Sequence, residues 1–182
     1  MFARTPRLLL RPGFPEDAPA LAAAIADEAI VRNLANAPWP YRMRDAEAFL
    51  ASPRDPVLPS FLIFERTGGP PRLVGACGLG RRPSGAVEMG YWIVRASWGR
   101  GFATEACGAL IDIARALGLA KLEAGHFVDN PASGRVLEKL GFQPVGIIAP
   151  RMSCARRTEV PARLMRLRLV EVAAEAREAL AA

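Results

Sequence analysis

The sequence predicts one domain of the α+β class, a three-layer arrangement in which a mixed, mostly antiparallel sheet of six or seven strands is flanked by about four helices. The chain has 182 residues, which suffices for one compact core and is short for two. Residues 60–94 alternate apolar runs with short turns, which is typical of an antiparallel meander. After Val94, apolar runs alternate with helical periodicities. The expected order is βααβββαβαββ.

The first part of the chain is expected to form one strand, two helices and a loop. Arg7–Pro12 predicts the first strand. Pro15–Ala29 is rich in alanine and has two acidic residues in its first turn, as the start of a helix favours. Asn36–Met43 contains two prolines and predicts a loop, and Arg44–Ala51 predicts a short second helix.

The middle of the chain predicts three strands in series, because short turns rich in glycine and proline separate its apolar runs. The strands are Ser60–Arg66, Arg72–Arg81 and Ala86–Val94. An antiparallel meander follows from the shortness of the two connections.

The last part of the chain predicts two helices and three strands. Apolar residues recur at helical spacing up to Leu117, where Gly118 is suited to end the helix. A strand over residues 121–128 is followed by a helix that has Pro131 in its first turn. Residues 142–149 and 160–170 are the last two expected strands, and residues 171–182 are an expected helical tail.

The cysteine and histidine content disfavours a disulfide framework and a metal site. The three cysteines, Cys77, Cys107 and Cys154, are odd in number and form no CxxC pair. Cys77 and Cys107 lie in apolar segments and are expected to be small buried side chains. The chain has a single histidine, His126.

Composition and charge limit the location and the partners. No apolar run approaches the ~18 residues of a membrane span, and the N-terminus lacks the apolar segment of a secretory signal, so a cytoplasmic protein without membrane contact is expected. The net charge of +6 and the pI of about 10.0 attract nucleic acids, acidic proteins and phosphate-bearing cofactors. The basic residues are scattered, which disfavours nucleic acid.

A glycine-rich stretch, WGRGFATEA, begins at Trp98 and connects a strand to a helix. Gly99 and Gly101 allow unusual backbone angles and leave the helix N-terminus bare, which is how a backbone binds phosphate. The stretch fits neither a Walker loop, since no Gly-Lys-Ser/Thr follows, nor the dinucleotide fingerprint, since Thr104 stands where a glycine or alanine is needed. A tight turn without further purpose is the other interpretation of these residues.

Residues 90–106 and 129–142 resemble the GNAT superfamily of acetyl-CoA-dependent N-acetyltransferases, and most closely the branch that acetylates ribosomal-protein N-termini. The resemblance covers most of the chain in element order and is specific over residues 86–146. The family's Q/R-x-x-G-x-G/A loop, which binds the CoA pyrophosphate, falls on residues 98–103, with Trp98 at the Gln/Arg position. The resemblance thus implies a cofactor site at Gly99, Arg100, Gly101, Phe102, Ala103 and Thr104.

Glu88 is the candidate base. On the strand Ala86–Val94, the odd-numbered side chains form one apolar face, whereas Glu88 and Gly90 lie on the other face, where the glycine leaves room for a substrate. Transfer of an acetyl group to an amine needs a neutral nitrogen, and amines with a pKa of about 8 to 10 need a base or a water relay. An ordinary half-exposed glutamate is the other interpretation.

The resemblance implies further roles around the second helix. By motif spacing, Leu137 stands where many relatives have a proton-donating tyrosine. Ser133 matches the serine that the related branch places near the CoA sulfur, with a first-turn helix serine as the alternative. Asn130 matches the residue that binds the pantetheine arm, with a turn asparagine as the alternative.

Trp92 and Ile93 are expected to offer backbone groups to the amides of the pantetheine arm, in the manner of strand addition. Core packing of their side chains is compatible with that role. His126 is a second candidate base, although a lone histidine in an apolar strand is more often structural.

The expected function is acetyl transfer from acetyl-CoA to a primary amine, either a protein N-terminus or a small molecule. A non-catalytic acyl-CoA-binding module and a nucleic-acid-binding domain are the other classes. Asn36–Tyr41 and Arg54–Ser60 are expected to frame the acceptor cleft. No metal is expected, and assembly as a homodimer is left open.

Overall fold

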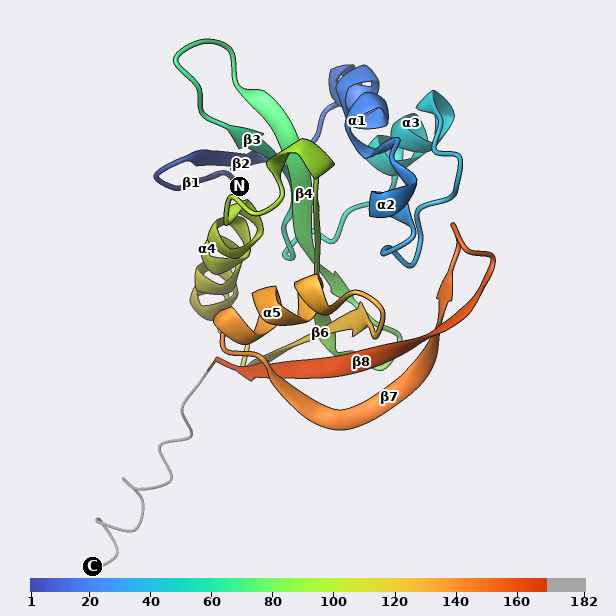
Figure 1. Cartoon of the computed structure of the whole chain (residues 1–182). Coiled ribbons are helices and arrows are strands. Elements are labelled where there is room, and N and C mark those ends of the chain that lie inside the picture. The colour runs from blue at the N-terminus through green and yellow to red at the C-terminus, as the bar shows by residue number, and fades with distance from the viewer. Residues whose placement is uncertain (170–182) are drawn as a thin grey trace, which may run out of the picture.

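The computed structural model describes residues 1–169, in which eight strands form a single sheet (Figure 1). Their spatial order is β1-β2-β3-β4-β5-β6-β8-β7. Every neighbouring pair is antiparallel except β5 and β6, which run parallel. The strands are β1 (Ala3–Arg4), β2 (Leu8–Arg11), β3 (Ser60–Glu65), β4 (Arg72–Arg81), β5 (Val87–Ile93), β6 (Lys121–Phe127), β7 (Gln143–Ser153) and β8 (Thr158–Arg168).

Helices cover both faces of the sheet and make a three-layer molecule (Figure 1). One face carries α4 and α5, and the other carries α1 and α3 over the β3–β4 half. The helices are α1 (Ala18–Ile25), α2 (Glu28–Val31), α3 (Met43–Ala51), α4 (Phe102–Ala116) and α5 (Pro131–Lys139), and the 3-10 turns are η1 (Pro15–Asp17) and η2 (Arg95–Ser97). The predicted fold class is confirmed.

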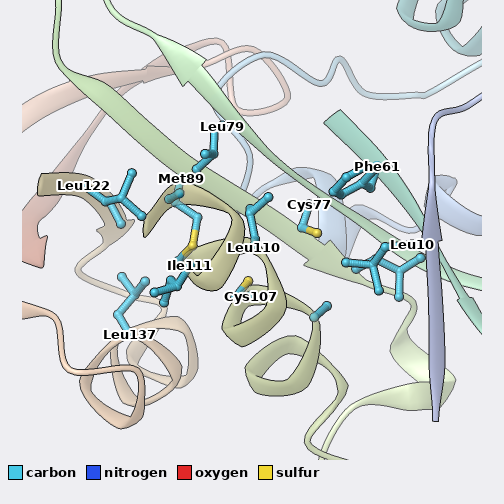
Figure 2. Close-up of a cluster of buried hydrophobic side chains, with 14 of the residues drawn as sticks. Leu10, Phe61, Cys77, Leu79, Met89, Cys107, Leu110, Ile111, Leu122 and Leu137 are labelled. Carbon is cyan, nitrogen blue, oxygen red and sulfur yellow. The ribbon is translucent and has the colours of Figure 1, made fainter. Parts of the chain in front are cut away.

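The main core lies between α4 and the sheet (Figure 2). Leu110 and Ile111 of α4 meet Met89 of β5, Leu122 of β6 and Leu137 of α5 there, and each of these side chains is at most 3% exposed. The buried face of α4 consists of Phe102, Ala106, Cys107, Leu110, Ile111 and Ala114. Burial of such an apolar stripe dominates folding energetics.

Two cysteines belong to this core, as the sequence predicts. Cys77 and Cys107 are buried and reduced. Burial raises the pKa of Cys77 to about 12 and raises that of Cys107 well above its usual value. Both therefore stay protonated at neutral pH and act as apolar side chains. Cys154 is exposed.

Several predicted boundaries are corrected. The helix expected over Pro15–Ala29 is interrupted, because Asp27 adopts an extended conformation and caps the separate helix α2 by accepting a hydrogen bond from the Ala29 N–H. The sheet gains a two-residue strand, β1, so the described residues hold eight strands rather than six or seven, and five α-helices rather than four. The predicted tail at 171–182 lies outside the described residues.

The β7–β8 hairpin reaches across the molecule and is bonded to the segment after α2. The Cys154 N–H donates to the Ala35 carbonyl at 2.9 Å, and Arg156 Nε donates to the Arg32 carbonyl at 2.8 Å. Figure 1 shows the far end of this hairpin beside α2. The last two strands therefore close one side of the space in front of β5 and β6.

No helix among residues 1–169 combines the length and the apolarity that a membrane crossing requires. The cytoplasmic location and the homodimer stay predictions.

The approach of β4 to β5 requires a glycine, which gives a first prediction. A Cβ on Gly75 would lie 2.2 Å from the Trp92 carbonyl oxygen, a backbone atom, whereas a Cβ on Gly80 of the same strand would meet nothing within 4 Å. Gly75→Ala is expected to lower the free energy of unfolding by about 1–3 kcal/mol or more, because the backbone must shift. Gly80→Ala is the control and is expected to be nearly neutral. Urea titration measures both, and equal midpoints would contradict the prediction.

Candidate active site

The parallel strands β5 and β6 diverge almost as soon as they meet. Their single register pair is Glu88 with Glu123, although β5 continues to Ile93 and β6 to Phe127. Strands that pair along their length satisfy each other's backbone groups, so the remainder of β5 presents unpaired groups toward β6. A linear ligand with amide groups can bind to such an edge by strand addition.

The alternation of backbone groups identifies which β5 residues face β6. The Val94 N–H donates to Val74 and the Arg82 N–H donates to Ala86, so the even-numbered residues of this hairpin bond to β4. Tyr91 and Ile93 therefore face β6.

The backbone prediction for Trp92 is corrected by this alternation, since the Trp92 carbonyl points to Gly75 of β4. Ile93 does lie on the β6 side, but its carbonyl already accepts the indole N–H of Trp98 at 2.7 Å. Trp98 is thus an internal donor that fixes the end of β5. The Ile93 N–H and the backbone of Tyr91 form the rest of this edge.

The glycine-rich loop lies beyond the end of β5 and begins α4. Gly99 and Gly101 have φ angles of 74° and 79°, in the left-handed region that favours glycine. Gly101 is the N-cap of α4 and no side chain caps this helix. The N–H groups of Phe102, Ala103 and Thr104 therefore lack intrahelical partners and, with the helix dipole, can bind an anion.

Arg100 and Phe102 support the loop rather than project from it. Arg100 forms an ion pair with Glu65 of β3, and its guanidinium lies 4.4 Å from the ring centre of Phe102. Phe102 is 1% exposed. Hydrogen bonds from Arg100, and then from Arg72, hold the pKa of Glu65 below its usual range, so this anchor is charged at neutral pH.

Arg7 holds the same loop from the N-terminal side. Its Nη1 donates to the Arg100 carbonyl at 2.9 Å, and its Nε donates to Glu105 of α4 at 2.7 Å. Burial acts to raise the pKa of Glu105, but hydrogen bonds from Thr5 and Arg7 outweigh it and lower that pKa. Two ion pairs thus fix the backbone that the glycines leave bare.

Asn130 and Ser133 open helix α5, on the same side of the sheet as α4. The Asn130 side chain caps the helix by accepting the Ser133 N–H at 3.3 Å. The Ser133 hydroxyl lies 2.8 Å from the hydroxyl of Tyr91 on β5. The hydroxyl of Tyr91 also donates to the Ser133 carbonyl at 3.1 Å, and burial raises its pKa above the usual phenol range. Ser133 is therefore paired with a second, protonated hydroxyl.

Leu137 and His126, the other two residues discussed in the sequence analysis, pack inside the fold. Leu137 is fully buried in the core and offers no proton (Figure 2). His126 lies beneath α5, where a Cβ on Gly134 would lie 3.0 Å from its ring, and its Nδ1 is 2.9 Å from the Phe127 carbonyl. Since strand side chains alternate, His126 and Glu88 lie on opposite faces of the sheet.

Glu88 lies on the sheet face opposite α4 and α5 and is held by two arginines. Arg82 Nη1 donates to Oε2 at 2.7 Å, while Arg151 donates from Nη1 to Oε1 at 2.5 Å and from Nη2 to Oε2 at 3.0 Å. The side chain of Glu88 is 16% exposed. These hydrogen bonds are charge-assisted and hold the carboxylate in one orientation.

The surface beside Glu88 is open. A Cβ on Gly80 or on Gly90 would meet nothing within 4 Å, and Gly80 is the register partner of Glu88. Next to Gly80, a hollow of about 340 Å³ is lined in part by Arg54, Asp55, Leu58 and Ser60. These four residues belong to the segment predicted to frame the acceptor cleft.

The loop Asn36–Tyr41 forms a second wall on this face. Trp39 and Tyr41 pack with Trp92 of β5 around the buried side chains of α2. Burial raises the pKa of Tyr41 to about 12, so its hydroxyl is neutral at physiological pH. The side chain of Trp92 thus lies on the same face of the sheet as Glu88, even though its backbone groups bond to β4.

Sequence reasoning missed three residues of this site. Tyr91 was assigned to the apolar face, which is where it lies, but its contact with Ser133 depends on how α5 packs on β5. Arg82 could have been found, because a two-strand hairpin brings residues on both sides of its turn together. Arg151 had no local signal, since it is 63 residues from Glu88.

The chain belongs to the GNAT acetyltransferase family. A family model described as "Acetyltransferase (GNAT) domain" matches residues 7–143, more than half of the chain. The uncharacterized N-acetyltransferase YoaA of Bacillus subtilis (strain 168) is 40% identical over 67 residues, which are 36% of this chain and 38% of that protein. The curated relatives are matched over less than half of their own length.

Solved structures share the fold over nearly the whole chain. A GNAT-family acetyltransferase from Bacillus anthracis superposes with a TM-score of 0.77 and 20% identity, over 94% of this chain and all of the other. RimL, a ribosomal L7/L12 alpha-N-protein acetyltransferase solved with coenzyme A, superposes with a TM-score of 0.74 and 18% identity, over 92% of this chain and 98% of the other. At these identities the likeness concerns the fold.

The bare backbone at Gly101 gives a second prediction. Gly101→Val is expected to lower CoA affinity at least tenfold, because its side chain covers the N–H groups that begin α4. Gly118→Val is the matched control, since Gly118 lies beyond the other end of α4 with a φ of 72° and free space around its Cβ. Both changes strain the backbone by roughly 1–3 kcal/mol. Calorimetry with CoA on the folded variants separates them, and equal affinities would refute the assignment.

Proposed function

We propose that the protein is an N-acetyltransferase that moves the acetyl group of acetyl-CoA to the primary amine of a protein or peptide N-terminus. The observation that carries this proposal is the divergence of β5 and β6. It leaves an opening between the two faces of the sheet, which carry different functional groups. The anion-binding loop and Ser133 lie at the α4–α5 side, and Glu88 lies on the opposite face. A donor and an acceptor can therefore approach one point from opposite sides.

Backbone groups of the chain can bind both the pyrophosphate and the pantetheine arm of CoA. The N–H groups of residues 102–104, at the positive end of the α4 dipole, bind the pyrophosphate. The edge formed by Tyr91 and Ile93 hydrogen-bonds the amides of the pantetheine arm, with Asn130 at the facing helix end. Because these donors are fixed by ion pairs and a cap, little ordering is needed on binding.

The chemical step needs one proton acceptor and one group that stabilises the departing thiolate. The amine nitrogen forms a bond to the acetyl carbon and the bond from that carbon to sulfur breaks. Glu88 takes the proton from the amine, directly or through a water molecule. The Ser133 hydroxyl donates a hydrogen bond to the departing thiolate and accepts one from Tyr91, whose single proton turns from the Ser133 carbonyl to Ser133 Oγ.

A protein N-terminus as acceptor is supported by the open surface over Gly80 and Gly90, which a peptide backbone can occupy. The structural neighbour RimL acts, by its description, on the α-amino group of a ribosomal protein. A screen of peptides, polyamines and aminoglycosides for acetyl-CoA-dependent CoA release tests the acceptor class. Preference for a small amine would replace the peptide, and no release with any amine would leave an acyl-CoA-binding module.

The role of Glu88 gives a third prediction, to be measured with the best acceptor of that screen. Glu88→Gln is expected to lower kcat by ~10²-fold or more, because the amide cannot accept a proton, and to leave CoA affinity nearly unchanged. Glu123→Gln is the control, since Glu123 is the register partner of Glu88 and is likewise paired with an arginine. Near-normal turnover of Glu88→Gln at neutral pH would assign the proton to a water chain instead.

The pairing of Ser133 with Tyr91 gives a fourth prediction. Ser133→Ala is expected to slow the chemical step about tenfold or more, since a hydrogen bond of ~1.4 kcal/mol to the leaving sulfur corresponds to a factor of ten. Tyr91→Phe is expected to slow it less, because the serine hydroxyl remains. Single-turnover acetylation distinguishes the variants. A Ser133→Ala enzyme as fast as the parent would show that solvent protonates the thiolate.

A further inference from the structure

The surroundings of Glu88 carry more positive than negative charge. Its single carboxylate is shared by Arg82 and Arg151, whose side chains are 40% and 30% exposed. The hollow next to Gly80 also has an excess of positive charge, because two arginines, Arg54 and Arg81, and one acid, Asp55, line it. An approaching amine is itself a cation at neutral pH, since its pKa is about 8. A cationic acceptor without further groups is therefore repelled at this surface.

The two guanidinium groups have donors to spare. Within residues 1–169, the guanidinium of Arg82 donates only from Nη1, so its Nε and Nη2 make no hydrogen bond there. Arg151 uses Nη1 and Nη2 for Glu88, and its Nε makes no hydrogen bond in the same range. A planar guanidinium with free donors binds carboxylates and phosphates through paired hydrogen bonds.

The fold leaves space for this arginine pair. A Cβ on Gly125 of β6 would lie 3.0 Å from Arg151 Nη1 and 3.8 Å from Glu88 Oε1. The absence of a side chain at Gly125 thus allows Arg151 to reach Glu88 across β6. On the other side, Gly80 and Gly90 leave the floor in front of the same carboxylate free. Both arginines therefore border the surface where the acceptor must lie.

We propose that the acceptor carries an anionic group close to its amine, a carboxylate in an acidic peptide N-terminus, and that Arg82 and Arg151 bind it. This inference rests on the proposed function and specifies its substrate class. The acceptor carboxylate offsets the repulsion of the ammonium group and directs the amine toward Glu88. It binds through the guanidinium N–H groups that Glu88 leaves unused, so Glu88 keeps its own hydrogen bonds and stays beside the amine.

The test compares acceptors that differ only in charge. C-terminally amidated tetrapeptides that begin with alanine followed by aspartate or by asparagine are assayed for CoA release, and the α-amides of aspartate and asparagine form a second pair. The parent protein is expected to prefer the aspartate peptide by at least tenfold in kcat/KM, and the Arg82→Gln and Arg151→Gln variants are expected to reduce that ratio to near one. A preference confined to the aspartate α-amide would assign the carboxylate to a small molecule and overturn the peptide part of the proposal.

Arg166→Gln is the matched control. Arg166 is 40% exposed, as Arg82 is, and is paired with Glu123, the register partner of Glu88. This variant is expected to keep the preference of the parent. Thermal unfolding confirms that each variant is folded. If the glutamine variants prove unstable, Arg82→Lys is measured instead; it keeps the charge and is expected to retain part of the preference.

The outcomes separate this inference from the proposed function. Equal rates for charged and neutral acceptors, or equal losses on both in the arginine variants, overturn the inference and leave acetyl transfer standing. In that case the arginines only neutralise Glu88. No CoA release with any of the four acceptors overturns the inference together with the peptide acceptor, and the wider amine screen then decides whether the protein transfers acetyl groups at all.

Discussion

The divergence of β5 and β6 after one register pair is the constraint on which the rest of the site depends. A sheet that stayed paired would satisfy the backbone of Tyr91 and Ile93 internally and would separate its two faces completely. Because the strands part, one edge of β5 is free, and residues on opposite faces of the sheet can act on the same bond. The close approach of β4 at Gly75 and the bond from the Trp98 indole to Ile93 hold β5 in this position.

The site uses charge in two different ways. At the α4 end, ion pairs of Arg7 with Glu105 and of Arg100 with Glu65 are supporting contacts, which leave the bare N–H groups of the helix to attract an anion. At Glu88, two guanidinium groups contact the carboxylate that is proposed as the base. A carboxylate held in this way is fixed in orientation and has few free lone pairs. The unused N–H groups of the two arginines lie beside this carboxylate, which connects the proposed acceptor recognition to the proposed base.

Local sequence rules predicted the parts of the fold whose partners lie close in the chain. The three strands between Ser60 and Val94 were placed to within a residue, because short turns determine their pairing. Gly118 and Pro131 end one helix and begin the next for reasons that lie in their own backbone geometry. The break at Asp27 was missed, since the alanine-rich pattern continues through it and only the cap contact with Ala29 separates α2.

The sequence by itself determined the fold class, the glycine loop at the start of α4 and the face on which Glu88 lies, because helix and strand periodicity and glycine conformations are local properties. Only the tertiary structure decided which groups surround those residues. Arg151 reaches Glu88 from a strand 63 residues away, and Tyr91 meets Ser133 through the packing of α5 on the sheet. Such contacts follow from strand order and from the space left at Gly125, which no local pattern in the chain encodes.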